Sequence, residues 1–496
     1  MIIFLASLSM VFLVFLVYWR TIYNYYIVDD FSVYKMGGDR PKSWLRRFYD
    51  NLCARTYHDD DPKKPGLNRI AHLQTIAIHS LVCIMIFLSF GKVFNNYIVS
   101  YLAALLFAFN PNNHEVSIWL SGKAYGYTSA CVLLAWMLPL LAPIVYFFAY
   151  SPKFYFNAIF SPLMFLALPG WWKLLALLFI YTFAVKAKWI FNPKTNTKLA
   201  AYVDKETNDI QNEAAVCFNP KNIIRAVKFY GYYFTNGILA NNLAFYQSYM
   251  SEYVTDKKGI EESNKPDKYF WVGLTVLLIL VENLIWNYNP AVFGLLWFTI
   301  NIAPVCNFIN LGQQHITSRY AYLPNIGLAL MLANMFISPF ELSLMFVAGL
   351  LLAGGLIGWY IRALKYSMRA YLNDFWHNHF EITFEPKYSY SWLLHGNMFF
   401  ARGQFNTALQ DYFEASLQYK DNFKVLFNIS SAYLAMGKIQ EAITYVEKAR
   451  ACDLVGQEKL KEDWLKEREE LIGKIVQAQQ QKINIKLKIS DIPIVI

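Results

Sequence analysis

Two adjacent carboxylates near the start of the chain have the residue types that group-transfer chemistry needs. Asp29 and Asp30 follow the first apolar segment in the stretch YYIVDDFSVY. Neighbouring carboxylates close to a membrane surface can bind a divalent cation or act as a general base. A solvated turn is the alternative interpretation of this pair. We therefore predict Asp29 and Asp30 as catalytic residues and as the ligands of a divalent cation cofactor.

Two further charged residues lie beside apolar segments. Glu115 occurs in FNPNNHEVSIWLSGK, and Arg319 opens a later apolar segment in SRYAYLP. An ionisable group at the edge of the hydrocarbon core is costly to place and usually functional, so we predict that Glu115 is catalytic, with a water-wetted loop as the alternative. The arginine suits bidentate contact with a phosphate. Snorkelling towards lipid headgroups is its alternative use.

Other kinds of site are not indicated. The chain has no serine or cysteine nucleophile constellation, no Walker loop and no GxGxxG motif. Its six cysteines are scattered without a CxxC pair, so neither a disulfide framework nor a zinc site is predicted. The formal net charge is +10, yet the basic residues form no stripe typical of a nucleic-acid-binding fold. We therefore predict no nucleic acid partner.

The elements that must position these residues are membrane helices. Hydrophobic residues make up 56% of the chain although its last quarter is polar, so the apolar surplus lies in the first 362 residues. This pattern is typical of an integral, multi-pass membrane protein in contact with the lipid bilayer. The apolar segments lie at residues 2–19, 73–92, 97–109, 126–149, 155–170, 171–186, 270–287, 290–308, 320–338 and 341–362.

One further segment, residues 226–245, decides the expected topology. It is aromatic and of mixed polarity, and it fits either an eleventh span or an interfacial helix. Eleven spans would place the polar loop 20–72, which carries the two aspartates, on the same side of the membrane as the C-terminal region. We therefore expect an all-α protein with about 10–11 transmembrane helices, and we favour eleven.

A 34-residue repeat follows the membrane segments, and Gly403 and Gly437 are separated by this period. The large and small residues that a tetratricopeptide repeat requires obey the same spacing, which predicts an α-solenoid that binds polypeptides. In the first unit these residues are Trp392, Gly396, Phe399, Ala408, Tyr412 and Ala415, and in the second they are Leu426, Ser430, Tyr433, Ala442, Val446 and Ala449. The predicted partner-binding residues are Trp392, Phe399, Tyr412 and Tyr433.

The domain organisation follows from these segments. Residues 1–365 are expected to form the transmembrane domain, with the 20–72 loop after its first helix. A peptide-binding module joined to such a domain predicts that a polypeptide or protein subunit docks on the repeats. The remaining expected divisions are a linker at 366–387, two tetratricopeptide repeats at 388–455, and a capping helix and tail at 456–496.

Three long segments resemble one family of membrane proteins. AALLFAFNPNNHEVSIWLSGK (103–123) resembles the family pattern AALLFALHPxHxEAVAWISGR, and AHLQTIAIHSLV (71–82) resembles FHLxNxLLHAL. LLWFTINIAPVCNFINLGQQHITSRYAYLPNIGLAL (295–330) resembles WFxxxLLPVSNLIPLGxxxAERYLYLPSLGLAL. Together they resemble the transmembrane-and-tetratricopeptide-repeat proteins, which are O-mannosyltransferases with the GT-C membrane fold, and their bacterial relatives.

The resemblance implies a GT-C-like fold and a sugar-transfer reaction. A polyprenyl-phosphate sugar would enter from the bilayer, and Asp29 or Asp30 would act as base on an acceptor hydroxyl or hold a metal. The repeats would hold the polypeptide acceptor. The residues implied to bind the donor phosphate are Arg319, Tyr320, Tyr322 and Lys123.

Several active-region positions depart from the family pattern. Ser318 replaces an acid, Asn110 and Asn113 replace histidines, Lys123 replaces an arginine and Tyr125 replaces another acid. This pattern fits a membrane scaffold that kept its fold while catalysis relaxed. It also fits a divergent enzyme that uses another donor.

Two functions are therefore expected. One is a membrane glycosyltransferase that transfers a sugar from a polyprenyl-phosphate donor to a polypeptide, in an endomembrane or a bacterial inner membrane; the surviving charged residues favour it. The alternative is a catalytically inactive structural or assembly subunit of a larger membrane complex. The 39 phenylalanines and 35 tyrosines fit an AT-rich genome of an organelle or an endosymbiont. An organelle-encoded subunit would be expected in the mitochondrial inner membrane. A transporter would leave the repeats unexplained.

Overall fold

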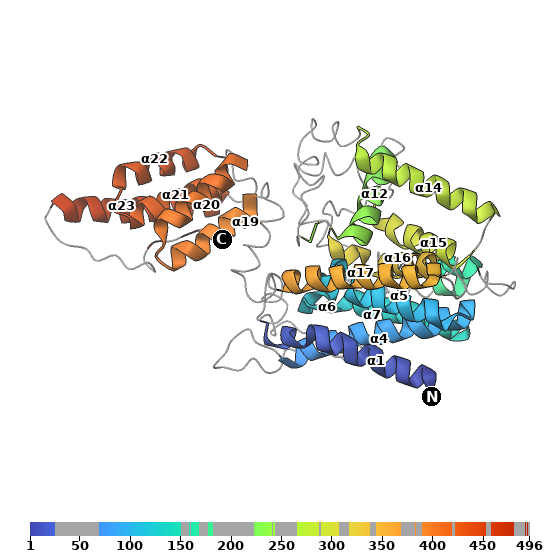
Figure 1. Cartoon of the computed structure of the whole chain (residues 1–496). Helices are drawn as coiled ribbons and strands as arrows, with labels where there is room; N and C mark the ends of the chain where they lie inside the picture. Colours follow the sequence, from blue (N-terminus) through green and yellow to red (C-terminus); the bar gives the residue numbers. More distant parts are fainter. Residues whose placement is uncertain are drawn as a thin grey trace. The chain divides into compact units, whose positions relative to one another are not determined.

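The computed structural model divides the chain into two compact units, Met1–Asp374 and Phe375–Ile496. The boundary falls within residues 366–387, the range expected as a linker. Throughout the described part of the chain the regular secondary structure is helical and contains no strand (Figure 1). The structure describes residues 1–24, 69–149, 158, 160–167, 177–181, 223–240, 242–243, 265–286, 289–306, 317–337, 344–368, 382, 389–418, 422–452, 458–480, 492 and 494.

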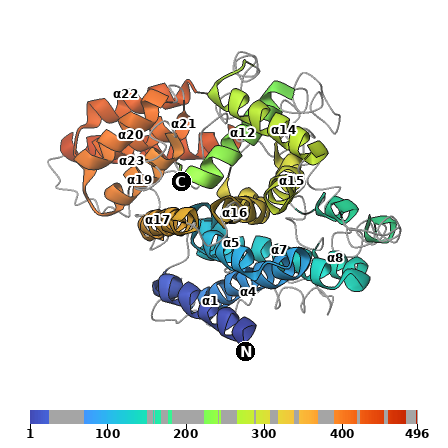
Figure 2. The same ribbon diagram turned by 45° about the vertical axis from the view of Figure 1, so that its right-hand side comes forward.

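The first unit is a bundle of apolar helices. These are α1 (Ile2–Tyr18), α4 (Arg69–Phe94), α5 (Tyr97–Phe109), α6 (His114–Ser117), α7 (Lys123–Met137), α8 (Ala142–Ala149), α12 (Ile223–Leu239), α14 (Lys268–Trp286), α15 (Pro290–Ile302), α16 (Tyr322–Ile337) and α17 (Leu344–Ser367). Helix α4 contacts α1, α5 and α7, while α16 contacts α5 and α15 (Figure 2). Short 3-10 turns join some of them: η1 (Trp19–Tyr23), η2 (Pro111–Asn113) and η10 (Ser318–Ala321).

Among the described residues, five helical segments are long and apolar enough to cross a membrane. They are Ile2–Tyr23, Arg69–Phe94, Lys268–Trp286, Ser318–Ile337 and Val347–Lys365. Three shorter apolar helices, Tyr97–Phe109, Pro139–Ala149 and Pro290–Val305, accompany them. These helices fit a multi-pass membrane protein in contact with a bilayer. Of the span expected at 155–170, the structure describes residues 158 and 160–167, with a 3-10 helix at Ser161–Ala167. Of the span expected at 171–186 it describes only residues 177–181, so the total of ten or eleven stays a prediction.

The span expected at residues 126–149 is two helices rather than one. Helix α7 ends at Met137 and α8 begins at Ala142. Leu138, between them, has φ −125° and ψ 70°. The ring of Pro139 excludes the helical conformation at the preceding residue, and proline has no N–H to continue the hydrogen-bond ladder. The break therefore follows from a single residue.

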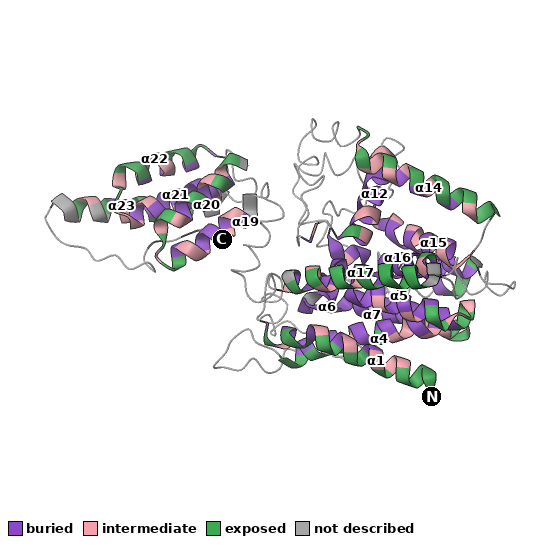
Figure 3. Cartoon of the chain, viewed as in Figure 1, coloured by how far each residue is buried: buried purple, intermediate pink, exposed green. Residues whose placement is uncertain are grey.

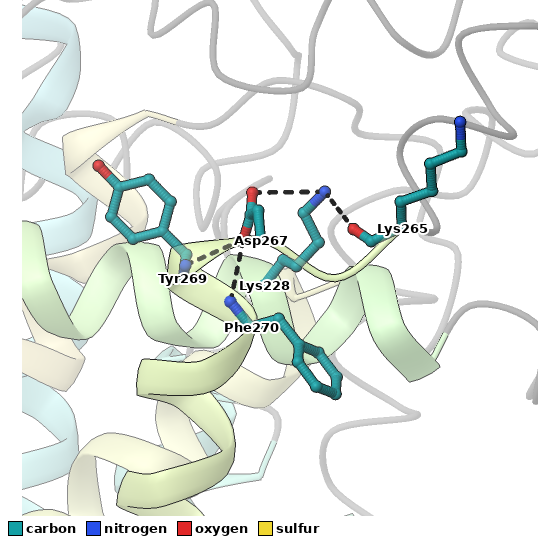
Figure 4. Close-up of polar contacts among 5 residues, drawn as sticks. All are labelled: Lys228, Lys265, Asp267, Tyr269 and Phe270. Carbon is teal, nitrogen blue, oxygen red and sulfur yellow. Dashed lines mark hydrogen bonds and ion pairs between the residues drawn. The ribbon is translucent and has the colours of Figure 1, made fainter.

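The segment expected at 226–245 forms α12, which ends at Leu239 where Ala240 takes a positive φ of 51°. An aspartate joins α12 to the start of α14 (Figure 4). Asp267 Oδ1 accepts hydrogen bonds from the backbone N–H groups of Tyr269 and Phe270, at 2.9 and 3.0 Å. Its Oδ2 lies 3.4 Å from Lys228 Nζ. The carboxylate thus satisfies free N–H groups at the first turn of α14 and pairs with a cation on α12.

The interior of the first unit is built on close helix contact. Figure 3 shows buried residues concentrated along α5, α7 and α16, whereas α1, α14 and α17 present exposed faces. Gly294 of α15 and Gly327 of α16 face each other, and a Cβ atom on either would overlap backbone atoms of the other helix. Small residues allow two helix backbones to approach in this way.

The second unit stacks helices in sequence order. They are α19 (Ser389–Ala401), α20 (Phe405–Gln418), α21 (Phe423–Ala435), α22 (Ile439–Arg450) and α23 (Glu458–Gln480). Each helix contacts the next, and α23 also contacts α21. Gly403 and Gly437 occupy the two turns within the helix pairs, and both have φ +74°. This left-handed conformation is readily available to glycine. The 34-residue spacing of the two glycines therefore reflects the same turn made twice.

The core of this unit uses the small and large residues of the sequence repeat. Ala408, Ala415, Ala442 and Ala449 are fully buried. A Cβ on Gly396 would overlap the ring of Tyr412, so the absence of a side chain there admits the aromatic ring. Helix α23 closes the unit, with Trp464 stacked on Phe423 at 5.9 Å between ring centroids. From the expected tail, Ile492 joins this core.

Candidate functional site

A short, buried polar segment between α5 and α7 is the meeting point of several helix ends. Helix α5 ends at Phe109, and the side chain of Asn110 then accepts a hydrogen bond from the backbone N–H of Asn112 at 3.0 Å. Pro111 starts the 3-10 turn η2, and the single-turn helix α6 follows directly. The segment carries Glu115 into the interior because its residues from Asn110 to Ser117 are all buried.

Asparagine side chains join this segment to two distant helices. Asn112 donates to the carbonyl oxygen of Asn236 at the end of α12, and Asn236 Nδ2 donates back to Asn112 Oδ1 at 2.9 Å. Asn325 Nδ2, in the first turns of α16, donates to Asn113 Oδ1 at 3.0 Å. Asparagines replace histidines of the family pattern at Asn110 and Asn113, and here their amides hold helices together.

Glu115 and Arg319, predicted from separate segments, lie together. The Glu115 side chain is 0% exposed, and its Oε2 lies 3.3 Å from Arg319 Nη1. Its other carboxylate oxygen, Oε1, accepts the backbone N–H of Ser318 at 3.0 Å. The Arg319 guanidinium also lies 5.3 Å from the ring centre of Trp119, a cation–π contact. A buried ion pair thus connects α6 with the start of α16.

Burial dominates the ionisation of Glu115, which lies outside the five candidate spans. It raises the pKa of the carboxyl from 4.5 to about 7. The Arg319 charge and the backbone N–H groups of Ser318 and Arg319 act in the opposite direction. Removing a carboxylate from water disfavours its charged form, whereas a nearby cation favours it. Burial therefore outweighs the nearby cation and the N–H groups, and the net shift of the Glu115 pKa is upward.

The remaining residues implied for phosphate binding are packed inside the unit. Tyr322 is fully buried, and its hydroxyl lies 2.7 Å from His79 Nδ1. His79 Nε2 lies 3.0 Å from the carbonyl oxygen of Ala108. Since a carbonyl only accepts, Nε2 carries the proton and Nδ1 accepts the tyrosine O–H. Tyr320 and Lys123 are also buried, and of the four only Arg319 keeps an accessible side chain, 15% exposed.

The predicted cation ligands Asp29 and Asp30 lie outside the described residues. Within the part of the chain that the structure describes, no group of three or more histidine, cysteine, aspartate or glutamate side chains could hold a metal ion. The divalent cation therefore stays a prediction that rests on the two aspartates.

The predicted partner-binding residues of the second unit differ in accessibility. Tyr412 is fully buried, and its hydroxyl donates to Asn397 Oδ1 at 2.8 Å. Trp392 and Phe399 are half-buried against the same core. Tyr433 is half-buried too, and it stacks on Tyr445 with ring centroids 5.6 Å apart. Tyr433 and its stacking partner therefore form the aromatic surface, while Tyr412 supports the interior.

Sequence reasoning missed three contributors to the site: Trp119, Asn236 and Asn325. All three are buried, and Trp119 contacts the predicted Arg319. Asn236 and Asn325 donate hydrogen bonds to asparagine side chains in the segment that carries Glu115. The two asparagines carried a usable signal, because a polar amide within an otherwise apolar helix needs a hydrogen-bond partner. The tryptophan carried no such signal, since aromatic residues are frequent throughout this chain.

Comparison with known proteins adds no relative. No protein-family model matches the chain, and neither a curated protein nor a solved structure matches it. The resemblance to the GT-C family therefore rests on the sequence segments alone. Function must be argued from the geometry of these residues.

Proposed function

We propose that this chain is a non-catalytic subunit of a larger membrane protein complex, with a docking module at its C-terminal end. The observation that carries the proposal is the state of Glu115. Both carboxylate oxygens are occupied, one by Arg319 and one by the Ser318 amide, and the side chain has no exposed surface. A general base must reach the proton that it removes. A carboxylate held in this way instead serves to join helices.

The other buried polar residues support the same conclusion. The hydroxyl of Tyr322 is engaged with His79, and the amides of Asn112 and Asn113 are engaged with α12 and α16. Each contact links segments that are far apart in the sequence. Asn325 Nδ2 donates within this network, although its Oδ1 has no partner among the described residues. Buried hydrogen bonds between distant segments favour a single helix arrangement. They suit a rigid membrane scaffold.

The second unit supplies the proposed docking module. We propose that its two helix pairs are tetratricopeptide repeats, on the support of the two identical glycine turns and the buried alanine positions. Stacked pairs of this type present extended surfaces for polypeptides. Lys438 lies 5.9 Å from the ring of Tyr433, and Lys448 lies 4.6 Å from the ring of Tyr445. These cations favour an acidic segment of the partner. We propose the mitochondrial inner membrane as the compartment, on the support of the high phenylalanine and tyrosine content alone.

Gentle purification of the full chain tests this proposal. We expect membrane proteins to accompany it in fixed stoichiometry after chemical crosslinking and mass spectrometry. Tyr433→Ala should reduce their recovery several-fold, because aromatic anchors dominate the energy of most interfaces. Thr444→Ala, an exposed position on α22, is the matched control and should not. A chain that purifies alone, with or without these changes, contradicts the proposal.

A glycosyltransferase is the second candidate, and the partly exposed guanidinium of Arg319 favours it. This side chain lies beside an acid and two aromatic rings, at 5.3 Å from Trp119 and 5.5 Å from Tyr320. Such an arrangement suits a phosphate leaving group. Turnover of a polyprenyl-phosphate sugar by the purified chain, abolished by Asp29→Asn, would establish the enzyme and overturn the structural subunit.

A further inference from the structure

A cavity of about 510 Å³ lies between the C-terminal ends of α1 and α17. Its walls combine apolar side chains with cations. From η1 and the last turn of α1 come Leu16, Val17, Trp19, Arg20, Thr21 and Asn24, and from the end of α17 come Lys365 and Met368. The volume falls within the range typical of small-molecule sites, about 300–1,000 Å³.

The described residues that line the cavity include two cationic side chains, Arg20 and Lys365, and no acidic one. Residues 1–24, 69–94 and 344–368 contain no aspartate or glutamate. Arg20 and Lys365 make no ion pair with an acidic side chain among the residues that the structure describes. Among the described residues, the lining of the cavity therefore carries two cations and no acidic side chain. An anionic group is the ligand that this charge distribution favours.

A buried hydrogen-bond donor lies in the same wall. Asn24 is only 2% exposed, and its Nδ2 has no acceptor within the described part of the chain. A buried amide without a partner loses the hydrogen bonds that it would make to water, so native proteins seldom keep one. A ligand oxygen in the cavity would satisfy it. The two cations and this amide together match a phosphate, which is negatively charged and rich in acceptors.

The surroundings place the cavity at the level of lipid headgroups. Helices α1 and α17 are both candidate membrane spans, and both end beside the cavity. Aromatic and cationic side chains alternate at this level: the Arg20 guanidinium lies 5.6 Å from the ring of Trp19, and the Arg69 guanidinium 5.1 Å from that of Tyr23. Tryptophan and tyrosine are enriched at membrane–water interfaces. Both helices present exposed faces (Figure 3), and large apolar side chains such as Phe12 and Leu351 lie on them.

We propose that this cavity holds the headgroup phosphate of an anionic diacyl phospholipid. Arg20 and Lys365 bind the phosphate and Asn24 donates a hydrogen bond to it. Leu16, Val17 and Met368 contact the first part of the acyl chains. A lipid fits better than free phosphate because the apolar wall would otherwise face water. The bound lipid fills the space between α1 and α17 and holds their ends in place.

Native mass spectrometry of the full chain in a neutral detergent tests the site. Phosphatidylglycerol and phosphatidylcholine are added at equal concentration, and one phosphatidylglycerol should be retained preferentially. Arg20→Gln and Lys365→Gln should each weaken its retention about fivefold, because a basic residue near an anionic lipid contributes about 1 kcal/mol. Lys92→Gln is the matched control, since this exposed lysine lies at the opposite end of α4, and it should have no effect.

A second pair of variants tests the cavity itself without changing charge. Leu16→Trp places a larger side chain in the wall, narrows the cavity and should weaken selective retention. Phe12→Trp, one turn earlier on the same helix and outside the cavity, should not. Equal retention of the two lipids by the wild-type protein overturns the proposal even if a variant fails to fold. Full competition by millimolar inorganic phosphate overturns it too, because the site would then take free phosphate.

Discussion

At the level of single residues, the surroundings of Glu115 are the feature on which the proposed function depends. In the sequence it is an acid near a membrane surface, which predicts catalysis. In the structure it is buried, paired with Arg319 and hydrogen-bonded to the Ser318 amide. The same residue type thus changes role with its surroundings, because a carboxylate acts as a base only where a substrate proton can reach it. The roles of the neighbouring asparagines also depend on their surroundings, because their buried amides form hydrogen bonds between helices.

The raised pKa of Glu115 predicts a pH-dependent stability. A folded-state pKa of about 7 against 4.5 means that the native protein binds the proton more tightly than the unfolded chain. Its stabilising contribution is therefore complete below pH 4.5 and is lost as pH rises through 7. Over that range the loss amounts to roughly 3 kcal/mol. Glu115→Gln should flatten the dependence of Tm on pH between 5 and 8, measured in detergent. An unchanged slope in this variant would contradict the assignment.

The ion pair predicts strong coupling between its two members. Arg319→Met leaves a buried carboxylate without its cation and should cost about 3–5 kcal/mol of unfolding free energy. In a Glu115→Gln background the same change should cost about 2 kcal/mol less, because a neutral amide needs no counter-charge. Denaturant unfolding of the four proteins measures this difference. Equal costs in the two backgrounds would show that the pair contributes nothing.

At the level of elements, backbone proximity governs the packing of the membrane helices. Helices α15 and α16 approach through Gly294 and Gly327, where a side chain would meet backbone atoms. Helix α17 carries Gly354 and Gly355, with nothing within 4 Å of an added Cβ. Glycine therefore has two uses in this bundle: Gly294 and Gly327 permit close contact between two helices, whereas Gly354 and Gly355 lie on an open face of α17.

This difference predicts opposite effects of one substitution at two sites. Gly327→Ala should lower the unfolding free energy by about 1–3 kcal/mol, because a tightly packed contact cannot yield. Gly354→Ala should be neutral or stabilise the protein by up to about 1 kcal/mol, because alanine favours a helix. Thermal unfolding of both variants in the same detergent makes the comparison. Similar losses at the two positions would contradict the packing described for α15 and α16.

At the level of the whole molecule, the chain combines a membrane bundle with a separate helical unit that begins at Phe375. Each unit has its own buried core, built from its own residues. Such a division allows the first unit to anchor the chain in the membrane while the second binds a partner, since each unit has a core of its own. The proposed docking function therefore belongs to the second unit and the proposed lipid site to the first.

Removing the second unit should separate these two properties. A chain that ends at Asp374 is expected to remain in the membrane fraction after carbonate extraction, because all five candidate spans are retained. It should lose the partner proteins that accompany the full chain. Selective retention of phosphatidylglycerol should persist. Partners that stay with the truncated chain would place the docking surface on the membrane unit instead.

Several local features of this protein follow directly from its amino-acid sequence. Apolar segments of sufficient length predict the membrane helices, the 34-residue spacing predicts the two equivalent glycine turns, and Pro139 explains a helix break that the apolar pattern alone concealed. The contact of Glu115 with Arg319, 204 positions later, and that of Asn113 with Asn325 are formed by the tertiary structure and cannot be read from the sequence. Hydropathy and helical period specify which face of a helix is buried. The partner of that face depends on how all the helices pack, and this is a property of the whole folded chain.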